Sequence, residues 1–179
     1  DNVESRGLGD VYKRQQLVCG GRRTGACPCV LNRSNHWRGD MKGRIKWVQD
    51  VMFVAESDSG HGIVLDGAPE SGGRNLGMRP MELVALGVGS CSSYDVVTIL
   101  KKARQEVTAC EAEIEASRVD ATPAVFESIH LHFVVTGKSL NEAQVKRAIE
   151  LSADKYCSAS IMLKNGGVKI THGFEIVEA

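Results

Sequence analysis

The stretch from Pro80 to Arg104 constrains the fold more than any other feature of this sequence. It reads PMELVALGVGSCSSYDVVTILKKAR. Proline suits the first turn of a helix, and the basic KKAR suits a helix C-terminus, so the stretch predicts one long helix. Its first half is apolar almost all round, which is typical of a helix that other elements bury on several sides.

The segments around this helix alternate with the period of β-strands. Before it, KGRIKWVQ, VMFVAES and HGIVLDG are separated by short polar breaks and predict a three-stranded antiparallel meander. After it, EVTACEAEIEASRV and VFESIHLHFVVTG predict two long antiparallel strands.

The C-terminal part predicts a second helix and two more strands. SLNE has the form of a capping box, with Ser139 as N-cap and Glu142 three residues on, and apolar residues keep helical spacing as far as Tyr156. The dipeptide Asn165-Gly166 is a hairpin signal, so strands are expected on both sides of it. The order βββ-α-ββ-α-ββ predicts the α+β class.

Residues 1–40 are expected to lie outside this fold. They are rich in Gly and Arg, show neither the helical nor the strand period, and begin without methionine, whereas Met41 opens the first patterned segment. SRGLGDVYKRQ also looks like translated adapter sequence, so we expect a non-native or disordered leader at 1–40 and a single domain at 41–179. A zinc site from Cys19, Cys27, Cys29 and His36 is disfavoured by its spacing, because paired C-x-x-C knuckles are the usual device.

The charge balance narrows the function classes. The 22 basic and 22 acidic residues cancel, so nothing favours nucleic acid or a membrane surface as partner. With no run of about 18 apolar residues and no apolar N-terminal stretch, a cytoplasmic location is expected. Six cysteines without a framework spacing are then expected to be thiols, important for reactivity or metal binding if at all.

Cys91 has unusual neighbours for a cysteine on an apolar helix. Gly87 and Gly89 each cost about 1 kcal/mol of helix stability relative to alanine, so close approach of another segment, or a bend, is expected beside it. Ser92, Ser93 and Asp95 add polar groups to dry surroundings. A polar pocket around the thiol accounts for both features, although a buried cysteine is by itself more often packing than chemistry.

RPMELVALGVGSC, followed much later by KYCSASIML, resembles the OsmC/Ohr family of thiol-dependent hydroperoxide reductases, most closely its YhfA-like subgroup. The resemblance covers residues 41–179 and agrees with the element order above. Pro80, Leu83 and Cys91 fall on the P-x-x-L motif and reactive cysteine of the family, and Cys157 on its second cysteine. It implies an intertwined homodimer in which antiparallel sheets wrap a central buried helix.

The resemblance also implies a reaction. Cys91 would attack the O–O bond of an organic hydroperoxide, and Cys157 would resolve the sulfenic acid into a disulfide that an external dithiol reduces, without cofactor or metal. Family peroxidases resemble one another in a glutamate after the proline and an arginine between early strands. Here Met81 follows Pro80 and that arginine is missing. The remaining candidates to activate Cys91 or to orient the peroxide are Glu82, Asp95 and Arg79.

Alternatives remain at this stage. Zinc held by Cys91 and Cys157 with the strand histidines His130, His132 and His172 is chemically conceivable, since His130 and His132 share one face by period two. Cys110 on an alternating strand is expected to be inert, and Tyr94 to lie in the core or a pocket wall. The main rival to a peroxidase is a thiol switch or small-molecule binding protein that keeps the fold and the cysteines.

Overall fold

The computed structural model describes residues 41–179. The chain divides at Val64 into two compact units. The segment 1–40, with the zinc ligands considered there, lies outside the described residues.

The described part of the first unit is the expected three-stranded meander. Its strands are β1 (Gly43–Gln49), β2 (Met52–Ser57) and β3 (Gly62–Leu65), in the order β1-β2-β3. β1 and β2 are antiparallel, and Asp50 turns between them with a positive φ of 49°. Among the residues of these three strands only Leu65, at the end of β3, is buried, so this sheet has almost no core of its own.

A loop tied by one carboxylate begins the second unit. The Asp66 oxygens accept hydrogen bonds from the backbone N–H groups of Gly67 at 2.8 Å, Arg74 at 3.1 Å and Leu76 at 3.0 Å. The hydrogen bond from Leu76 is the largest of the causes that lower the pKa of Asp66. The loop therefore holds an ionised side chain in place just ahead of the long helix.

That helix is α2 (Pro80–Lys102), with Pro80 in its first turn as expected. The backbone N–H of Arg79, the N-cap residue, donates to Glu82 Oε2 at 2.9 Å, which satisfies a backbone group at the helix start. Lys101 and Lys102 occupy the last turn, where cations are favourable.

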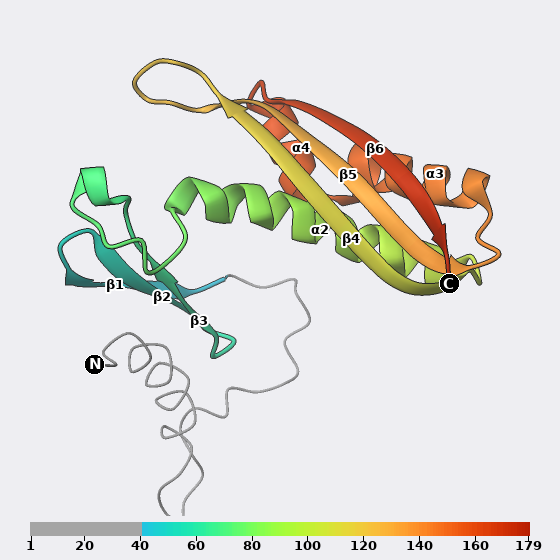
Figure 1. The fold of residues 1–179 in the computed structure, drawn as a ribbon, viewed down its shortest axis with the longest axis horizontal. Coiled ribbons are helices and arrows are strands. Elements are labelled where there is room, and N and C mark those ends of the chain that lie inside the picture. Colours follow the sequence, from blue (N-terminus) through green and yellow to red (C-terminus); the bar gives the residue numbers. More distant parts are fainter. Residues whose placement is uncertain (1–40) are drawn as a thin grey trace, which may run out of the picture. The chain divides into compact units, whose positions relative to one another are not determined.

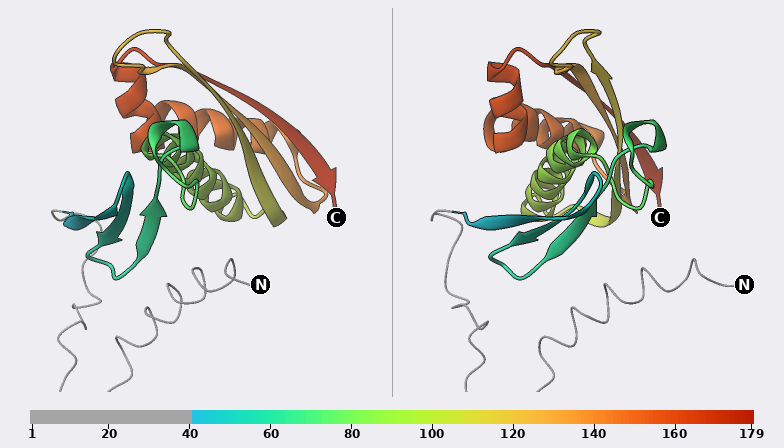
Figure 2. Two further views of the ribbon diagram at one scale, coloured as in Figure 1. Left: turned by 60° about the vertical axis from the view of Figure 1, so that its left-hand side comes forward. Right: turned by 90° about the vertical axis from the view of Figure 1, so that its left-hand side faces the viewer.

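A second sheet contains β4 (Glu106–Arg118), β5 (Phe126–Lys138) and β6 (Lys169–Glu178), in the order β4-β5-β6. β4 and β5 form the expected antiparallel pair. β5 and β6 are parallel, not antiparallel as expected. The chain between them must cross over the sheet, and it does so through helices on the face that α2 also covers (Figures 1 and 2).

The crossover corrects three expectations. Helix α3 (Glu142–Leu151) begins at Asn141, not Ser139, because the Asn141 side chain accepts from the backbone N–H of Gln144 at 3.1 Å. It continues as a π-helical turn, η2 (Ser152–Tyr156). The segment expected as a strand before Asn165 is instead helix α4 (Ser158–Asn165), so β6 has no hairpin partner there. The α+β class itself is confirmed.

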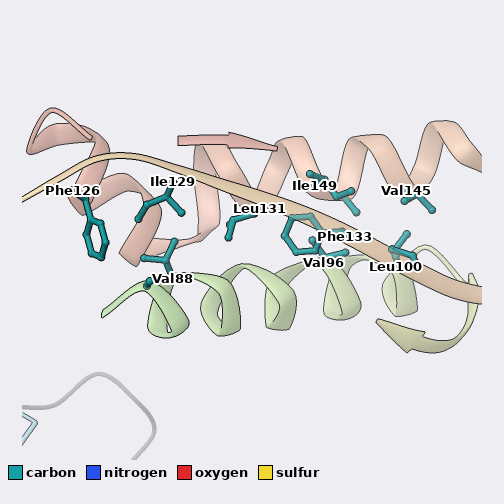
Figure 3. Close-up of a cluster of buried hydrophobic side chains, with 12 residues drawn as sticks. Val88, Val96, Leu100, Phe126, Ile129, Leu131, Phe133, Val145 and Ile149 are labelled. Atoms are coloured by element: carbon teal, nitrogen blue, oxygen red, sulfur yellow. The ribbon is translucent and has the colours of Figure 1, made fainter. Parts of the chain in front are cut away.

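The core lies between this sheet and the helices (Figure 3). Leu131, Phe133 and Val135 on β5 are fully buried because alternate residues of a strand point to one face. The other buried apolar residues of the cluster come from α2, β5 and α3, namely Ala85, Val88, Val96, Leu100, Phe126, Ile129, Val145, Ala148 and Ile149.

Helix α2 is less buried than its composition predicts. Leu100 and Val96 are fully buried, but Val84, Leu86 and Tyr94 are 42%, 47% and 73% exposed. The expectation that Tyr94 belongs to the core is therefore wrong for the single chain. By length and mean hydropathy α2 also meets the criterion for a membrane-spanning helix, a criterion that core helices of soluble proteins meet as well.

Close packing explains one of the two glycines before Cys91. A Cβ on Gly89 would overlap Ile114 Cδ1 of β4 and lie 3.2 Å from Ile114 Cγ1. A Cβ on Gly87 would meet no atom within 4 Å in the described part of the chain. Helix α2 thus approaches the sheet at Gly89.

Replacing Gly89 by alanine is expected to be strongly coupled to Ile114. The new Cβ gains about 1 kcal/mol of helix propensity but displaces the isoleucine side chain. Ile114→Val removes the overlapping Cδ1, so the double variant should be more stable than the sum of the singles by about 1 kcal/mol. Urea unfolding of the four proteins of this cycle measures the coupling. Additive effects would contradict the close packing.

Candidate functional site

Two side chains of α2 meet a third side chain from a distant part of the sequence. The ligand atoms of Cys91, Asp95 and Cys157 all lie within 4.8 Å of one another. Cys91 and Asp95 come from α2, four residues apart and therefore on one helical face, whereas Cys157 follows the π-helical turn η2. Cys157 is fully buried and Cys91 is half-buried. We call these three residues the Cys-Asp cluster.

The position of Cys157 follows from local structure. It is the N-cap of α4, with extended backbone, and its sulfur accepts from the Ser160 N–H at 3.4 Å. A helix N-terminus carries unpaired N–H groups and a partial positive charge, which favours an anionic sulfur. The π-helical turn before it is a form often found at functional sites.

Buried serines surround the two sulfurs. The Ser92 hydroxyl donates to Cys157 Sγ at 3.2 Å and lies 3.3 Å from the Ser160 hydroxyl. The Ser152 hydroxyl donates to the Ser92 carbonyl at 3.3 Å and to Asp95 Oδ2 at 3.4 Å. The polar pocket expected beside Cys91 is therefore present, although it is centred on Cys157.

The sequence reading had pointed to Ser92 but missed Ser152 and Ser160. The one signal for Ser160 is its position three residues after Cys157, the spacing between an N-cap and the N–H that it accepts from. That signal was hidden because the segment had been read as a strand.

The surroundings shift the two thiols in opposite directions. Burial raises the pKa of Cys91 above its ordinary value of 9.0, and Cys157 and Asp95 add to this, against the favourable N–H of Ala159. Burial also acts to raise the pKa of Cys157, but hydrogen bonds from Ser160 and Ser92 outweigh it and lower the value below 9.0. Burial raises the pKa of Asp95 as well. Of the two thiols, Cys157 therefore loses its proton more readily than Cys91.

Arg79 and Glu82 lie at the other end of the helix segment. They pair with each other, with Arg79 Nη1 donating to Glu82 Oε1 at 3.0 Å. Nine helical residues separate Glu82 from Cys91, a distance of about 13 Å along the axis. Within one chain the two therefore stay apart from the cluster, and their role as activating groups stays a prediction.

The strand histidines do not join the cysteines. His130 and His132 lie on the face of β5 opposite the core residues Leu131 and Phe133, so the sheet separates them from α2. His130 lines a pocket of about 420 Å³ on that outer face. His172 stacks on Phe133 with ring centroids 6.3 Å apart, and burial lowers its pKa.

Cys110, which was expected to be inert, packs against the core from β4. It is half-buried, and burial raises its pKa. It serves as an internal control for cysteine chemistry, because it lies outside the Cys-Asp cluster.

Replacing Ser92 by alanine is expected to raise the pKa of Cys157, because the variant loses a hydrogen bond to the thiolate. The thiolate fraction of Cys157 below pH 9 should fall about tenfold. A thiol whose pKa is lower in the folded than in the unfolded protein stabilises the fold at pH values above its unfolded-state pKa. This stabilisation is lost as the pH falls through the folded-state pKa. The variant should therefore lose most stability at alkaline pH. Thiolate absorbance against pH, corrected with Cys157→Ser, measures the shift. The Ser93 hydroxyl donates to Gly89 O at 2.9 Å, so Ser93→Ala should leave the titration curve of Cys157 unchanged. An equal pKa shift in both variants would contradict the role assigned to Ser92.

Comparison with known proteins gives consistent matches. A family model described as OsmC-like protein matches residues 72–173. The protein YhfA of Escherichia coli K12 is 47% identical over 139 residues, which are 78% of this chain and all of that protein. A hypothetical protein from Aquifex aeolicus VF5 has a crystal structure with a TM-score of 0.66 and 28% identity, over 78% of this chain and 98% of that one. At the level of the fold alone, an organic hydroperoxide resistance protein OsmC from Legionella pneumophila matches with a TM-score of 0.61 and 17% identity, over 78% of this chain and 99% of that one.

Proposed function

The chain belongs to the OsmC family, and on this premise we propose that it is a thiol peroxidase that reduces organic hydroperoxides with Cys91 and Cys157. The observation that carries the proposal is the proximity of the two sulfurs, at most 4.8 Å apart. A disulfide needs about 2.05 Å between sulfurs, so the two sulfurs have to approach each other by less than about 3 Å.

The accessible thiol takes the first step. Cys91 is half-buried and Cys157 is fully buried, so a peroxide reaches Cys91 first. The thiolate of Cys157 is placed to accept the proton of Cys91 as the Cys91 sulfur attacks the outer oxygen of ROOH. The O–O bond breaks, the alkoxide takes up a proton and leaves as ROH, and Cys91 becomes sulfenic acid.

The second step closes the cycle. Cys157 attacks the sulfenic sulfur, water leaves, and a Cys91–Cys157 disulfide forms. An external dithiol then reduces this bond and is itself oxidised to a disulfide. Donors around the two sulfurs include the hydroxyls of Ser92 and Ser160 and the backbone N–H groups of Ser160 and Ala159.

A second candidate function is supported by the electrostatics. The raised pKa of Cys91 and the distance of Arg79 from it favour slow thiol oxidation over fast turnover. A thiol switch would form the same disulfide but would not cycle with an added dithiol.

Consumption of an organic hydroperoxide by the reduced protein in the presence of a dithiol separates these functions. The peroxidase should consume many equivalents per chain, and peptide mass mapping should find a Cys91–Cys157 disulfide when the dithiol is omitted. Cys110→Ser is the matched control and should turn over like the parent protein. One slow equivalent with the same disulfide would favour the switch, and no disulfide in folded protein would contradict both.

We further propose that two copies of the chain associate through the exposed apolar face of α2. Val84, Leu86 and Tyr94 form an uncovered apolar surface on an otherwise core-forming helix. The three-stranded sheet also has Leu65 as its one buried residue, and small sheets need packing against another element to be stable. A second copy is the partner that the expected homodimer provides.

Replacing Tyr94 by lysine is expected to weaken this dimer at least about tenfold, because a charge would have to be desolvated at the interface. Analytical ultracentrifugation over a range of protein concentrations measures the dissociation constant. Tyr94→Phe keeps the ring and should associate normally. If the lysine variant sediments like the parent protein at every concentration, Tyr94 does not lie in an interface.

A further inference from the structure

The Cys-Asp cluster has the composition of a metal site as well as of a redox pair. Two sulfurs and a carboxylate oxygen lie within 4.8 Å of one another. Thiolate and carboxylate are both zinc ligands, with bonds of about 2.3 Å to sulfur and 2.0–2.2 Å to oxygen. In a tetrahedral shell, bonds of about 2.3 Å put two sulfurs about 3.8 Å apart. The cluster therefore needs to contract by at most about 1 Å to hold a metal.

Charge balance also favours a cation at this place. No salt bridge within residues 41–179 involves Asp95, since the ion pairs described there are Arg44–Glu56, Arg79–Glu82 and Lys164–Asp154. The groups that face the cluster are neutral hydroxyls and backbone N–H groups. Within the described residues, the carboxylate of this half-buried site thus forms no ion pair with a basic side chain that would compete with a metal.

The surroundings hold the three side chains in place. Ser92 and the Ser160 N–H donate to Cys157 Sγ at 3.2 and 3.4 Å, and Ser152 donates to Asp95 Oδ2 at 3.4 Å. Such outer hydrogen bonds orient metal ligands. Cys91 and Asp95 share a rigid helix, so only Cys157 has to be placed by a separate element.

We propose that the reduced Cys-Asp cluster binds one Zn²⁺ through the sulfurs of Cys91 and Cys157 and a carboxylate oxygen of Asp95, with the fourth position left to water. Binding replaces the thiol protons, up to two of which leave to solvent, and no electron is transferred. The disulfide cannot supply these ligands, so metal binding and oxidation exclude each other. This inference does not depend on peroxidase activity.

The ligand set distinguishes this site from the alternative considered on the sequence. Of the histidines considered for a zinc shell, His130 and His132 lie on the opposite face of the sheet. His172 lies on the core face but is not among the residues whose ligand atoms gather with the two sulfurs. Asp95, which the sequence suggested only as an activating group, supplies the third ligand atom instead, because it lies one helical turn after Cys91.

The test uses the full chain with Cys19→Ser, Cys27→Ser and Cys29→Ser, so that cysteines of the leading segment cannot bind metal. The protein is reduced, freed of metal with a chelator, and titrated with Zn²⁺ by calorimetry. Co²⁺ serves as a second probe, because its thiolate charge-transfer and d–d absorption report sulfur ligands and geometry. We expect one metal per chain, with thiolate bands, and no binding after the Cys91–Cys157 disulfide has formed.

Matched variants assign the ligands. Cys91→Ser and Cys157→Ser should each abolish the thiolate bands or weaken binding at least about 100-fold, and Asp95→Asn should weaken it at least about tenfold. Cys110→Ser should bind like the background protein. Absence of binding to the reduced protein, or binding unchanged in Cys157→Ser, would overturn the proposal. Since no peroxide is present, either result leaves the proposed peroxidase activity to its own assay.

Discussion

Serine at position 91 is expected to lower the turnover of organic hydroperoxide by at least about 100-fold, because a hydroxyl cannot replace a thiol as the nucleophile toward the O–O bond. Cys91 is the more exposed of the two clustered thiols, so no other sulfur of the cluster is as accessible. Stopped-flow measurement of peroxide consumption with a dithiol present gives the rate. Circular dichroism and sedimentation of the same sample show whether the fold is kept.

Two comparison variants make this result specific. With the dithiol omitted, Cys157→Ser should consume about one equivalent of peroxide, more slowly than the parent protein because it lacks the proton acceptor, and then stop, leaving a sulfenic acid on Cys91 that a 1,3-dicarbonyl reagent traps. Cys110→Ser should behave like the parent protein. If Cys91→Ser consumes one equivalent and Cys157→Ser consumes none, the roles of the two cysteines are reversed, as the lower pKa of Cys157 would allow. Undiminished turnover in Cys91→Ser would refute the proposed mechanism.

Alanine at position 133 is expected to destabilise the fold by about 3–5 kcal/mol, because it leaves a cavity between the sheet and the helices. Phe133 is fully buried on the central strand β5 and stacks on His172. Such a loss is a large part of the stability of a domain of this size. Urea unfolding at one fixed protein concentration, with an unchanged denaturant slope, measures the loss.

The neighbouring residue supplies the control. Val134 follows Phe133 on the same strand but faces the other side of the sheet, where it is half-buried. Val134→Ala should cost less than about 1.5 kcal/mol. Equal losses at positions 133 and 134 would mean that the core does not lie on the face assigned to it.

The elements predicted correctly are those with a strong local signal. Pro80 and the basic last turn delimit α2, and period-two alternation reveals β4 and β5. Cys91 and Asp95 share a face because they are four residues apart on one helix. Neither inference needs any information from a distant part of the chain.

The errors lie where a distant partner overrides a local signal. The Asn165-Gly166 dipeptide indicated a hairpin, but Ser158–Asn165 forms α4 and β6 pairs in parallel with β5. A parallel strand pairs with a segment far away along the chain, and the residue types of a turn carry no information about that pairing. The hairpin reading also concealed Cys157 as an N-cap and Ser160 as its donor.

By itself, then, the sequence determined the α+β class and the long helix, and it singled out Cys91 and Cys157 as candidates. It did so through proline position, hydrophobic period and a recognisable motif, all of which act within a few residues. The tertiary structure decided that Cys157 meets Cys91 and Asp95, that serines lower the pKa of Cys157, and that His130 and His132 lie across the sheet. The reason is that Cys157 reaches α2 through the crossover between β5 and β6, in which α3, η2 and α4 pack beside α2. Such long-range packing produces no periodic pattern in the sequence.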